Sequence, residues 1–110
     1  MLKKLIILIA VGVCGNCLAG ELIKGAAILE VASNGSNSKN FAVLIEGGAG
    51  ACASRTPRWI YFPEDKAPSL ATYNQSFDIA LTALNFDRKV RIHNYSDNSC
   101  SGADYISIIR

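Results

Sequence analysis

Short segments rich in β-branched and aromatic residues recur along the chain from residue 25 onward, separated by polar or glycine-rich stretches. In 41–48 and 89–95 the apolar residues take alternate positions, which is typical of a β-strand with one buried face. We predict five strands, at residues 25–32, 41–48, 58–62, 89–95 and 103–109. Turns at 33–40 and 96–102 would join the first two strands, and the last two, as hairpins.

The period changes between residues 69 and 86, where apolar residues recur at steps of three and four. This spacing predicts an amphipathic helix, with Ser69 after Pro68 as its N-cap. The recurring residues are Leu70, Tyr73, Phe77, Ala80, Leu81 and Leu84. We expect the stripe formed by Tyr73, Phe77, Leu81 and Leu84 to pack in the core rather than to line a ligand groove.

The predicted order is therefore β-β-β-α-β-β, without a repeat or an internal domain boundary. This order predicts an α+β fold, a small OB-like antiparallel β-barrel or sheet with one helix.

The first nineteen residues have the pattern of a secretory signal peptide. Lys3 and Lys4 precede an apolar run at 5–13, and small residues then lead to Ala19, after which cleavage is expected. A run of about nine residues is too short to span a membrane, which takes about 20. Lipid anchoring and a retained segment are the alternatives. We thus divide the chain into a signal peptide, 1–19, and one OB-like domain, 20–110.

The predicted leader contains a Cys-x-x-Cys motif, formed by Cys14 and Cys17. In a redox enzyme such a motif sits within a βαβ unit, whereas here it lies in a removable segment. We therefore do not assign it a redox or metal-binding function.

Removal of the predicted leader changes the balance of charged residues in the chain. The whole chain has 11 Lys and Arg against 9 Asp and Glu, and removing Lys3 and Lys4 leaves 9 against 9. A neutral domain without a basic run lacks the electrostatic footprint of a nucleic-acid-binding protein. We expect no nucleic-acid partner and no membrane span in the mature protein.

Two cysteines remain after cleavage, Cys52 and Cys100. In an oxidising compartment two such cysteines most simply form a disulfide, and a loop of about 49 residues makes this bond worth about 4 kcal/mol. The alternative is two buried free thiols. The glycine-rich stretch 47–54 lacks the ending of a phosphate-binding loop and is interpreted as the turn that carries Cys52. Because the chain begins with a predicted signal peptide, we expect a secreted or periplasmic location.

The segment FDIALTALNFDRKVRIHNYSDNSCSGADYISI, residues 77–108, combines a helix ending in Ala-Leu-Thr-Ala-Leu, a Val-Arg-Ile-His strand, a cysteine turn and a last strand. Over residues 50–110 the chain resembles the B subunits of AB5 toxins of the subtilase-cytotoxin type and short secreted bacterial proteins related to them. The resemblance implies an OB-fold pentamer that binds host glycans and delivers an enzymatic A subunit. It also implies the Cys52–Cys100 disulfide.

Two groups of residues are candidates for sugar binding, because a sugar ring needs an aromatic platform beside hydrogen-bonding groups. Trp59 and Tyr61 lie two residues apart on one predicted strand and so share a face. Tyr95 and Tyr105 flank the cysteine turn, together with Asn94, Asp97 and Asn98. Core packing is the alternative for Trp59, and ordinary sheet surface is the alternative for the two tyrosines.

Arg91 and His93 share a face of another predicted strand and could receive a carboxylate such as that of sialic acid. A solvated face or a cross-strand pair is the alternative. His93 has no nucleophile or orienting acid that the sequence identifies, so we do not expect an enzyme. We also expect no cofactor and no metal.

These observations favour a secreted glycan- or receptor-binding module of the AB5 B-subunit type. The alternative is a periplasmic or secreted structural or protein-interaction domain without sugar affinity. A small secreted enzyme is the third and weakest hypothesis.

Overall fold

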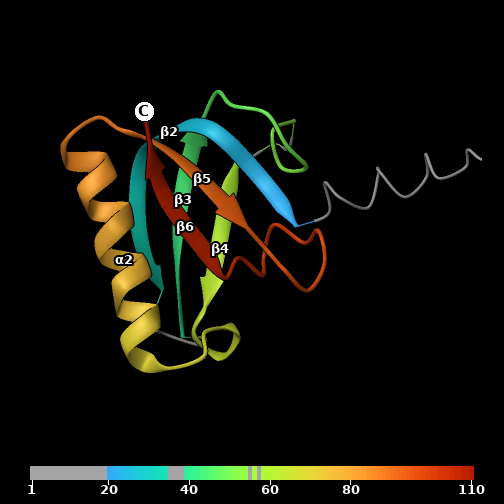
Figure 1. Ribbon diagram of the computed structural model, residues 1–110, viewed down its shortest axis with the longest axis vertical. Helices are drawn as coiled ribbons and strands as arrows, with labels where there is room; N and C mark the ends of the chain where they lie inside the picture. Colours follow the sequence, from blue (N-terminus) through green and yellow to red (C-terminus); the bar gives the residue numbers. More distant parts are fainter. Residues whose placement is uncertain (1–19, 35–38, 55, 57) are drawn as a thin grey trace, which may run out of the picture.

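A computed structural model describes residues 20–34, 39–54, 56 and 58–110. The predicted leader, with Cys14 and Cys17, lies outside the described residues. The five strands are β2 (Glu21–Asn34), β3 (Asn40–Glu46), β4 (Trp59–Pro63), β5 (Lys89–His93) and β6 (Tyr105–Ile109). A short 3₁₀ helix, η1 (Glu64–Lys66), leads from β4 to the long helix α2 (Leu70–Asn85). The order β-β-β-α-β-β is confirmed (Figure 1).

The strands form one antiparallel sheet in the order β4-β3-β2-β5-β6. Both predicted hairpins, β2–β3 and β5–β6, are present. The sheet is not closed by a ladder between β4 and β6. However, the Tyr61 N–H donates to the Cys100 carbonyl (2.9 Å) and the Ala103 N–H donates to the Tyr61 carbonyl (3.0 Å). The fold is therefore a small α+β sheet that curls toward an OB-like barrel.

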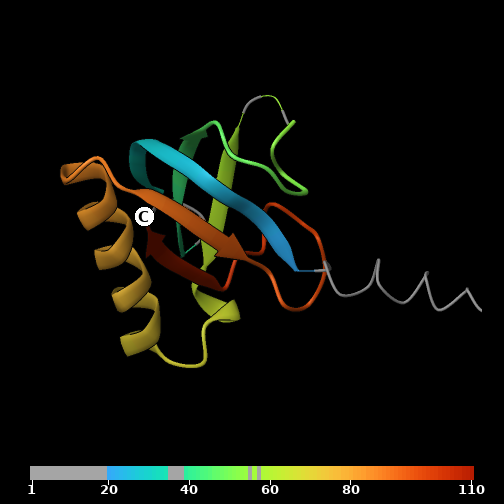
Figure 2. The same cartoon turned by 45° about the horizontal axis from the view of Figure 1, so that its top comes forward.

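β2 is longer than the prediction, which covered only 25–32. Its first part pairs with β5 and its last part pairs with β3, so β2 is the central strand and belongs to both halves of the sheet (Figure 2). The register shifts between Glu21 and Ile23, between Lys24 and Ala26, and between Ile28 and Glu30. Such bulges bend a strand and increase its twist, which lets one strand serve both halves of a curled sheet.

Helix α2 begins as predicted, because the Ser69 side chain accepts a hydrogen bond from the Thr72 N–H (3.1 Å). The residues that the helix buries fully are Ala80 and Ala83. Tyr73, Phe77 and Leu84 are partly buried and pack on the core, as expected for the apolar stripe. Leu81, the fourth member of the predicted stripe, is not among the side chains packed on the core, whereas Ile79 is. Leu70 departs from the pattern, since 58% of it is exposed. It lies in the first turn of α2 and is not among the side chains packed on the core.

The core lies between the helix and the concave face of the sheet. Phe41 of β3 is at its centre: its ring stacks on Phe62 and meets the edges of Tyr73 and Phe77, with ring centres 4.5–5.5 Å apart. These contacts join β3, β4 and α2, and thereby hold β4 in place although it is an edge strand.

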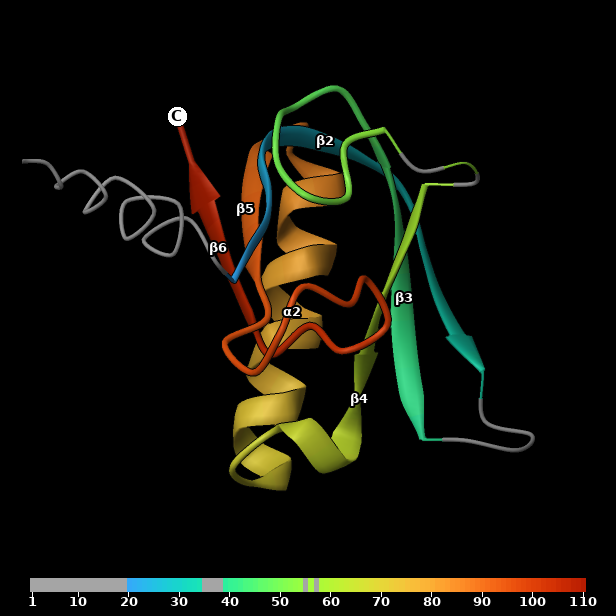
Figure 3. The same ribbon diagram turned by 90° about the vertical axis from the view of Figure 1, so that its right-hand side faces the viewer.

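Cys52 and Cys100 form the predicted disulfide, with Cα atoms 6.0 Å apart. The bond joins the loop after β3 to the loop between β5 and β6 (Figure 3). The β5–β6 loop also reaches η1, because Lys66 Nζ donates a hydrogen bond to Asn94 Oδ1 (3.5 Å). Near Cys52 the chain runs along the start of β2. The Lys24 and Ala49 backbones exchange two hydrogen bonds, and the Cys52 N–H donates to the Leu22 carbonyl (2.8 Å).

Candidate functional site

A small hollow lies on the outer face of the β2–β3–β4 half of the sheet. Ile60 and Phe62 point into the core, so alternation along β4 places Trp59 and Tyr61 on the opposite face. In the neighbouring strands Tyr61 stands beside Ala42, and Ala42 stands beside Ala32. Because alanine has only a methyl group, this row leaves space next to the Tyr61 ring.

The hollow is lined by Ala32, Asn40, Ala42, Trp59 and Tyr61 and has a volume of about 150 Å³. Trp59 and Tyr61 are both partly exposed, so neither is a fully buried core residue. Ala42 lies on the floor and is 5% exposed. The prediction that the two aromatic residues share a face is confirmed, and the alternative of core packing for Trp59 is wrong, because alternation turns it away from the core.

A larger hollow of about 570 Å³ adjoins the first where β3 begins and β4 ends. Asn40 lines both hollows. Asn40 pairs with Pro63 across the two strands, on the same face as Ala42 and Tyr61. The remaining lining comes from η1 and the start of α2, with Lys39 before β3: Lys39, Glu64, Asp65, Ala67, Ser69 and Leu70.

Glu64 affects the electrostatics of this region. The pKa of the Tyr73 hydroxyl is raised above its ordinary value of 10.0, first by burial and then by the negative charge of Glu64. The Glu64 carboxylate therefore lies close enough to Tyr73 for its negative charge to disfavour ionisation of the hydroxyl. Tyr73 is therefore a neutral hydroxyl at physiological pH.

The other candidate residues meet at the opposite edge of the sheet. His93, Tyr95 and Tyr105 form an aromatic cluster, in which the His93 ring stacks on Tyr95 at 5.1 Å and meets the edge of Tyr105 at 5.2 Å. The two tyrosine rings are also edge to face, 5.9 Å apart. Tyr95 is 66% exposed and Tyr105 is 37% exposed. The structure thus brings together three residues that the sequence only suggested were near one another.

Glu21 joins this cluster, and sequence reasoning missed it. Its Oε2 lies 3.3 Å from Arg91 Nε and 3.8 Å from His93 Nε2. The pairing follows from the β2–β5 register, which places Glu21 opposite His93. The cross-strand alternative for Arg91 and His93 is therefore confirmed. The guanidinium already has a carboxylate partner, so an incoming acid would have to compete with Glu21.

Asn94 explains how the loop beside the cluster is held. Its side chain is fully buried. Nδ2 donates to the Asp97 carboxylate (2.6 Å) and to the Ser99 carbonyl (3.0 Å), while Oδ1 accepts from the N–H groups of Ser96 and Asp97. Such a satisfied buried amide fixes a loop without regular secondary structure. Asn94 and Asp97 thus support the loop, and Asn98 accepts a hydrogen bond from the Gly20 N–H (3.1 Å).

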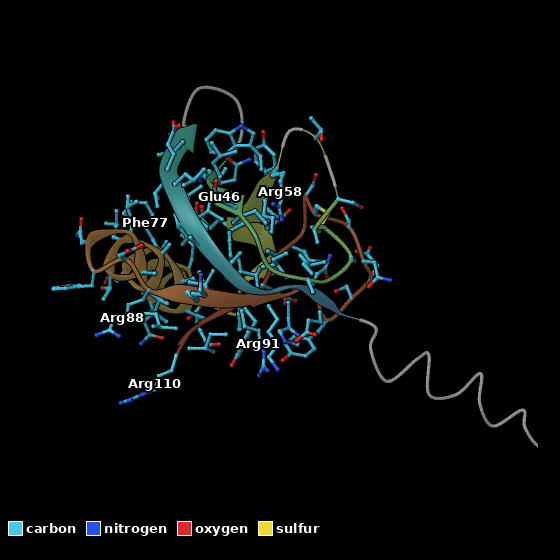
Figure 4. All side chains as sticks on the ribbon, turned by 90° about the horizontal axis from the view of Figure 1, so that it is seen from above. Glu46, Arg58, Phe77, Arg88, Arg91 and Arg110 are labelled. Atoms are coloured by element: carbon cyan, nitrogen blue, oxygen red, sulfur yellow. A yellow bond between two sulfur atoms is a disulfide. The ribbon has the colours of Figure 1, made fainter. Side chains whose placement is uncertain are left out.

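Trp59 and Tyr61 therefore lie on β4, whereas Arg91, His93, Tyr95 and Tyr105 lie on β5, β6 and the loop between them. In the sheet order β3 and β2 stand between the two groups. Figure 4 shows the same division, with Arg58, which precedes Trp59, and Arg91 in different parts of the view. The candidate residues form two sites rather than one.

Within the described residues, no group of three or more His, Cys, Asp or Glu side chains could hold a metal ion. The described helices include none that is both long and apolar enough to cross a membrane.

Comparison with curated proteins and with solved structures found no match. A family model, however, matches residues 2–110, which is nearly the whole chain. The chain belongs to that family, DUF5992, which is described as a family of unknown function.

Proposed function

We propose that this protein is a secreted glycan-binding module, of the kind that AB5 toxin B subunits represent, and that it holds a sugar ring in the hollow beside Trp59 and Tyr61. The observation that carries the proposal is the hollow itself. Two partly exposed aromatic side chains stand over a floor of alanine methyl groups, and Asn40 lies at its edge.

The chemistry of this hollow suits a sugar. One face of a pyranose is apolar and packs on an aromatic ring, while its hydroxyl groups need hydrogen-bond donors and acceptors at the edge. The Tyr61 hydroxyl can supply both. The volume of about 150 Å³ is well below the roughly 300–1,000 Å³ of pockets that enclose drug-sized molecules. A shallow hollow of this size suits one ring bound at the surface.

The aromatic cluster supports the proposal less well. Its three rings are in contact with one another, and its guanidinium is paired with Glu21. The contacts that a sugar would use are thus largely made within the protein. The cluster is better suited to joining the start of β2 to β5, β6 and the Asn94 loop.

A glycan array tests the proposal with three variants. We expect the wild type to retain a defined set of glycans and Tyr61→Ala to lose about tenfold or more in affinity, because the platform is removed. Tyr61→Phe keeps the ring and should lose less. Tyr95→Ala removes an exposed aromatic residue from the other site and is the matched control, with binding unchanged.

Two results would contradict the proposal. Retention of no glycan by the wild type would exclude sugar binding. Loss of binding in Tyr95→Ala, with Tyr61→Ala unaffected, would exclude the Trp59–Tyr61 hollow and assign the sugar to the aromatic cluster. Thermal unfolding of each variant separates loss of binding from loss of fold.

Secretion, a pentameric assembly and an enzymatic partner subunit belong to the same proposal. The Cys52–Cys100 disulfide supports a secreted or periplasmic location, because such bonds persist in oxidising compartments. The strand order and the one helix support the OB-like fold that the B-subunit resemblance implies. Native mass spectrometry of the secreted protein tests both points: we expect cleavage after Ala19 and a fivefold assembly mass, and a monomer would contradict the ring.

A protein-interaction domain without sugar affinity is the second candidate. The observation that favours it is the position of β6 at the edge of the sheet, with Ile108 38% exposed. An edge strand offers backbone N–H and C=O groups to another strand. If this candidate is correct, Ile108→Lys should abolish association with the partner or with a second copy while leaving the glycan array blank.

A further inference from the structure

We propose that the small hollow is one end of a longer binding groove, and that the protein binds an extended neutral oligosaccharide rather than one terminal sugar. The inference rests on the proposed glycan binding at Trp59 and Tyr61. It adds a second part of the site, formed by η1 and the first turn of α2, and thereby names the class of ligand.

The first support is continuity. On β4, alternation places Trp59, Tyr61 and Pro63 in one row on the outer face, and on β3 it places Ala42 and Asn40 beside them. Asn40 lines both the small hollow and the large one. A ligand that leaves the Tyr61 ring along this row therefore enters the hollow between η1 and α2.

The second support is size. The large hollow, at about 570 Å³, falls within the range of sites that hold a whole ligand, whereas the small one does not. A single sugar on Tyr61 would leave most of the combined space to water. Several linked sugars would fill it, and each would add contact area without needing a deep pocket.

The third support is the chemistry of the lining. Carboxylates at Glu64 and Asp65 are strong acceptors for sugar hydroxyl groups, and Lys39 is a donor. Leu70 and Pro63 are apolar surfaces on which the carbon face of a ring can rest. Leu70 is 58% exposed although it begins an amphipathic helix, so its side chain is available at this surface.

The charges indicate a neutral saccharide. Two carboxylates and one ammonium group line the large hollow, so an acidic sugar would meet repulsion at Glu64 and Asp65. The aromatic cluster, with Arg91, lies elsewhere on β5 and β6 and contributes nothing to the groove. The groove therefore selects for length and hydroxyl pattern rather than for negative charge.

The test measures affinity against chain length by calorimetry. The probes are N-acetylglucosamine and its β-1,4-linked oligomers, and glucose with its β-1,4-linked oligomers, each with one, two and four units. In the series that binds, we expect the tetramer to bind about tenfold more tightly than the monosaccharide. Equal affinity for all lengths in both series would overturn the inference.

Variants assign the gain to the large hollow. Leu70→Ser and Asp65→Asn should each weaken tetramer binding by about threefold to tenfold, while monosaccharide binding changes by less than about twofold. Tyr61→Ala should weaken binding at every length. Asp78→Asn makes the same chemical change as Asp65→Asn on an exposed part of α2 and should have no effect.

Different results would contradict the proposed sugar site at Tyr61 and the proposed longer groove. If monosaccharides bind and neither Leu70→Ser nor Asp65→Asn changes tetramer binding, the groove is wrong and the Tyr61 hollow stands. If the glycan array itself is blank, both are wrong. Stronger binding of a uronic-acid tetramer than of its neutral counterpart would overturn the choice of a neutral ligand.

Discussion

At the scale of residues, glycine decides how closely two segments can approach. Gly50 has φ +141°, and a Cβ atom placed on it would lie 2.5 Å from the Leu22 carbonyl oxygen. That contact is with backbone, which cannot move aside without breaking the hydrogen bond from the Cys52 N–H to Leu22. Gly25 has φ +84°, but a Cβ atom there would meet nothing within 4 Å.

Alanine substitutions at these glycines should therefore differ in cost. We expect Gly25→Ala to lower the free energy of unfolding by about 1 kcal/mol, the cost of a side chain in the left-handed region. Gly50→Ala should cost about 3 kcal/mol or more, because steric overlap is added to strain. Urea denaturation monitored by circular dichroism measures both. Equal losses would show that the close approach to Leu22 is unimportant.

At the scale of elements, two alanines set how closely α2 approaches the sheet. Ala80 and Ala83 are 0% and 1% exposed, whereas the larger side chains of the helix are only partly buried. The helix therefore rests on the sheet through its smallest residues, and Tyr73, Phe77 and Leu84 add partly buried contacts with the core. Phe77 of α2, labelled in Figure 4, packs against Phe41 of β3 with ring centres 5.3 Å apart.

A larger side chain at Ala80 should push α2 away from the sheet. We expect Ala80→Leu to destabilise the protein by about 1–3 kcal/mol through overpacking. Ala71→Leu adds the same atoms on an exposed face of the first turn and should change stability by less than about 0.5 kcal/mol. Thermal unfolding of the two variants in parallel tests this. A stabilised Ala80→Leu variant would reveal spare volume under the helix.

At the scale of the whole molecule, the disulfide ties together loops that have little regular structure. Cys52 and Cys100 are 48 residues apart in the sequence, and their loops meet β2 and β4 through backbone hydrogen bonds. Because a small domain buries a limited core, a link of this kind is a large part of its total stability.

Loss of the disulfide should cost about 4 kcal/mol on the chain-entropy model. We expect a Cys52→Ala/Cys100→Ala variant to unfold at a much lower urea concentration than the oxidised wild type. Adding a reductant should shift the wild type toward the variant and leave the variant unchanged. An unchanged midpoint in the reduced wild type would mean that the core alone holds the fold.

Some features of the fold could be predicted from the sequence, and others could not. The helix, its Ser69 cap, both hairpins and the disulfide follow from periodicity, capping chemistry and cysteine count. The beginning of β2 was missed, because Glu21 to Lys24 becomes a strand only by pairing with β5, far along the chain. Leu70 fits the helical period, yet 58% of it is exposed and it does not pack on the core.

The candidate site residues, too, were only partly predictable from the sequence. Sequence alone determined that Trp59 and Tyr61 share a face, and so do Arg91 and His93, because side chains alternate along a strand. Only the tertiary structure decided what stands beside them. Strand register put Ala32 and Ala42 next to Tyr61, which opens a hollow. It also put the Glu21 carboxylate against the Arg91 guanidinium and the His93 ring, so an incoming acid would meet a carboxylate already in place. Local periodicity sets the direction of a side chain, whereas its neighbours depend on pairing between distant segments, which no local pattern encodes.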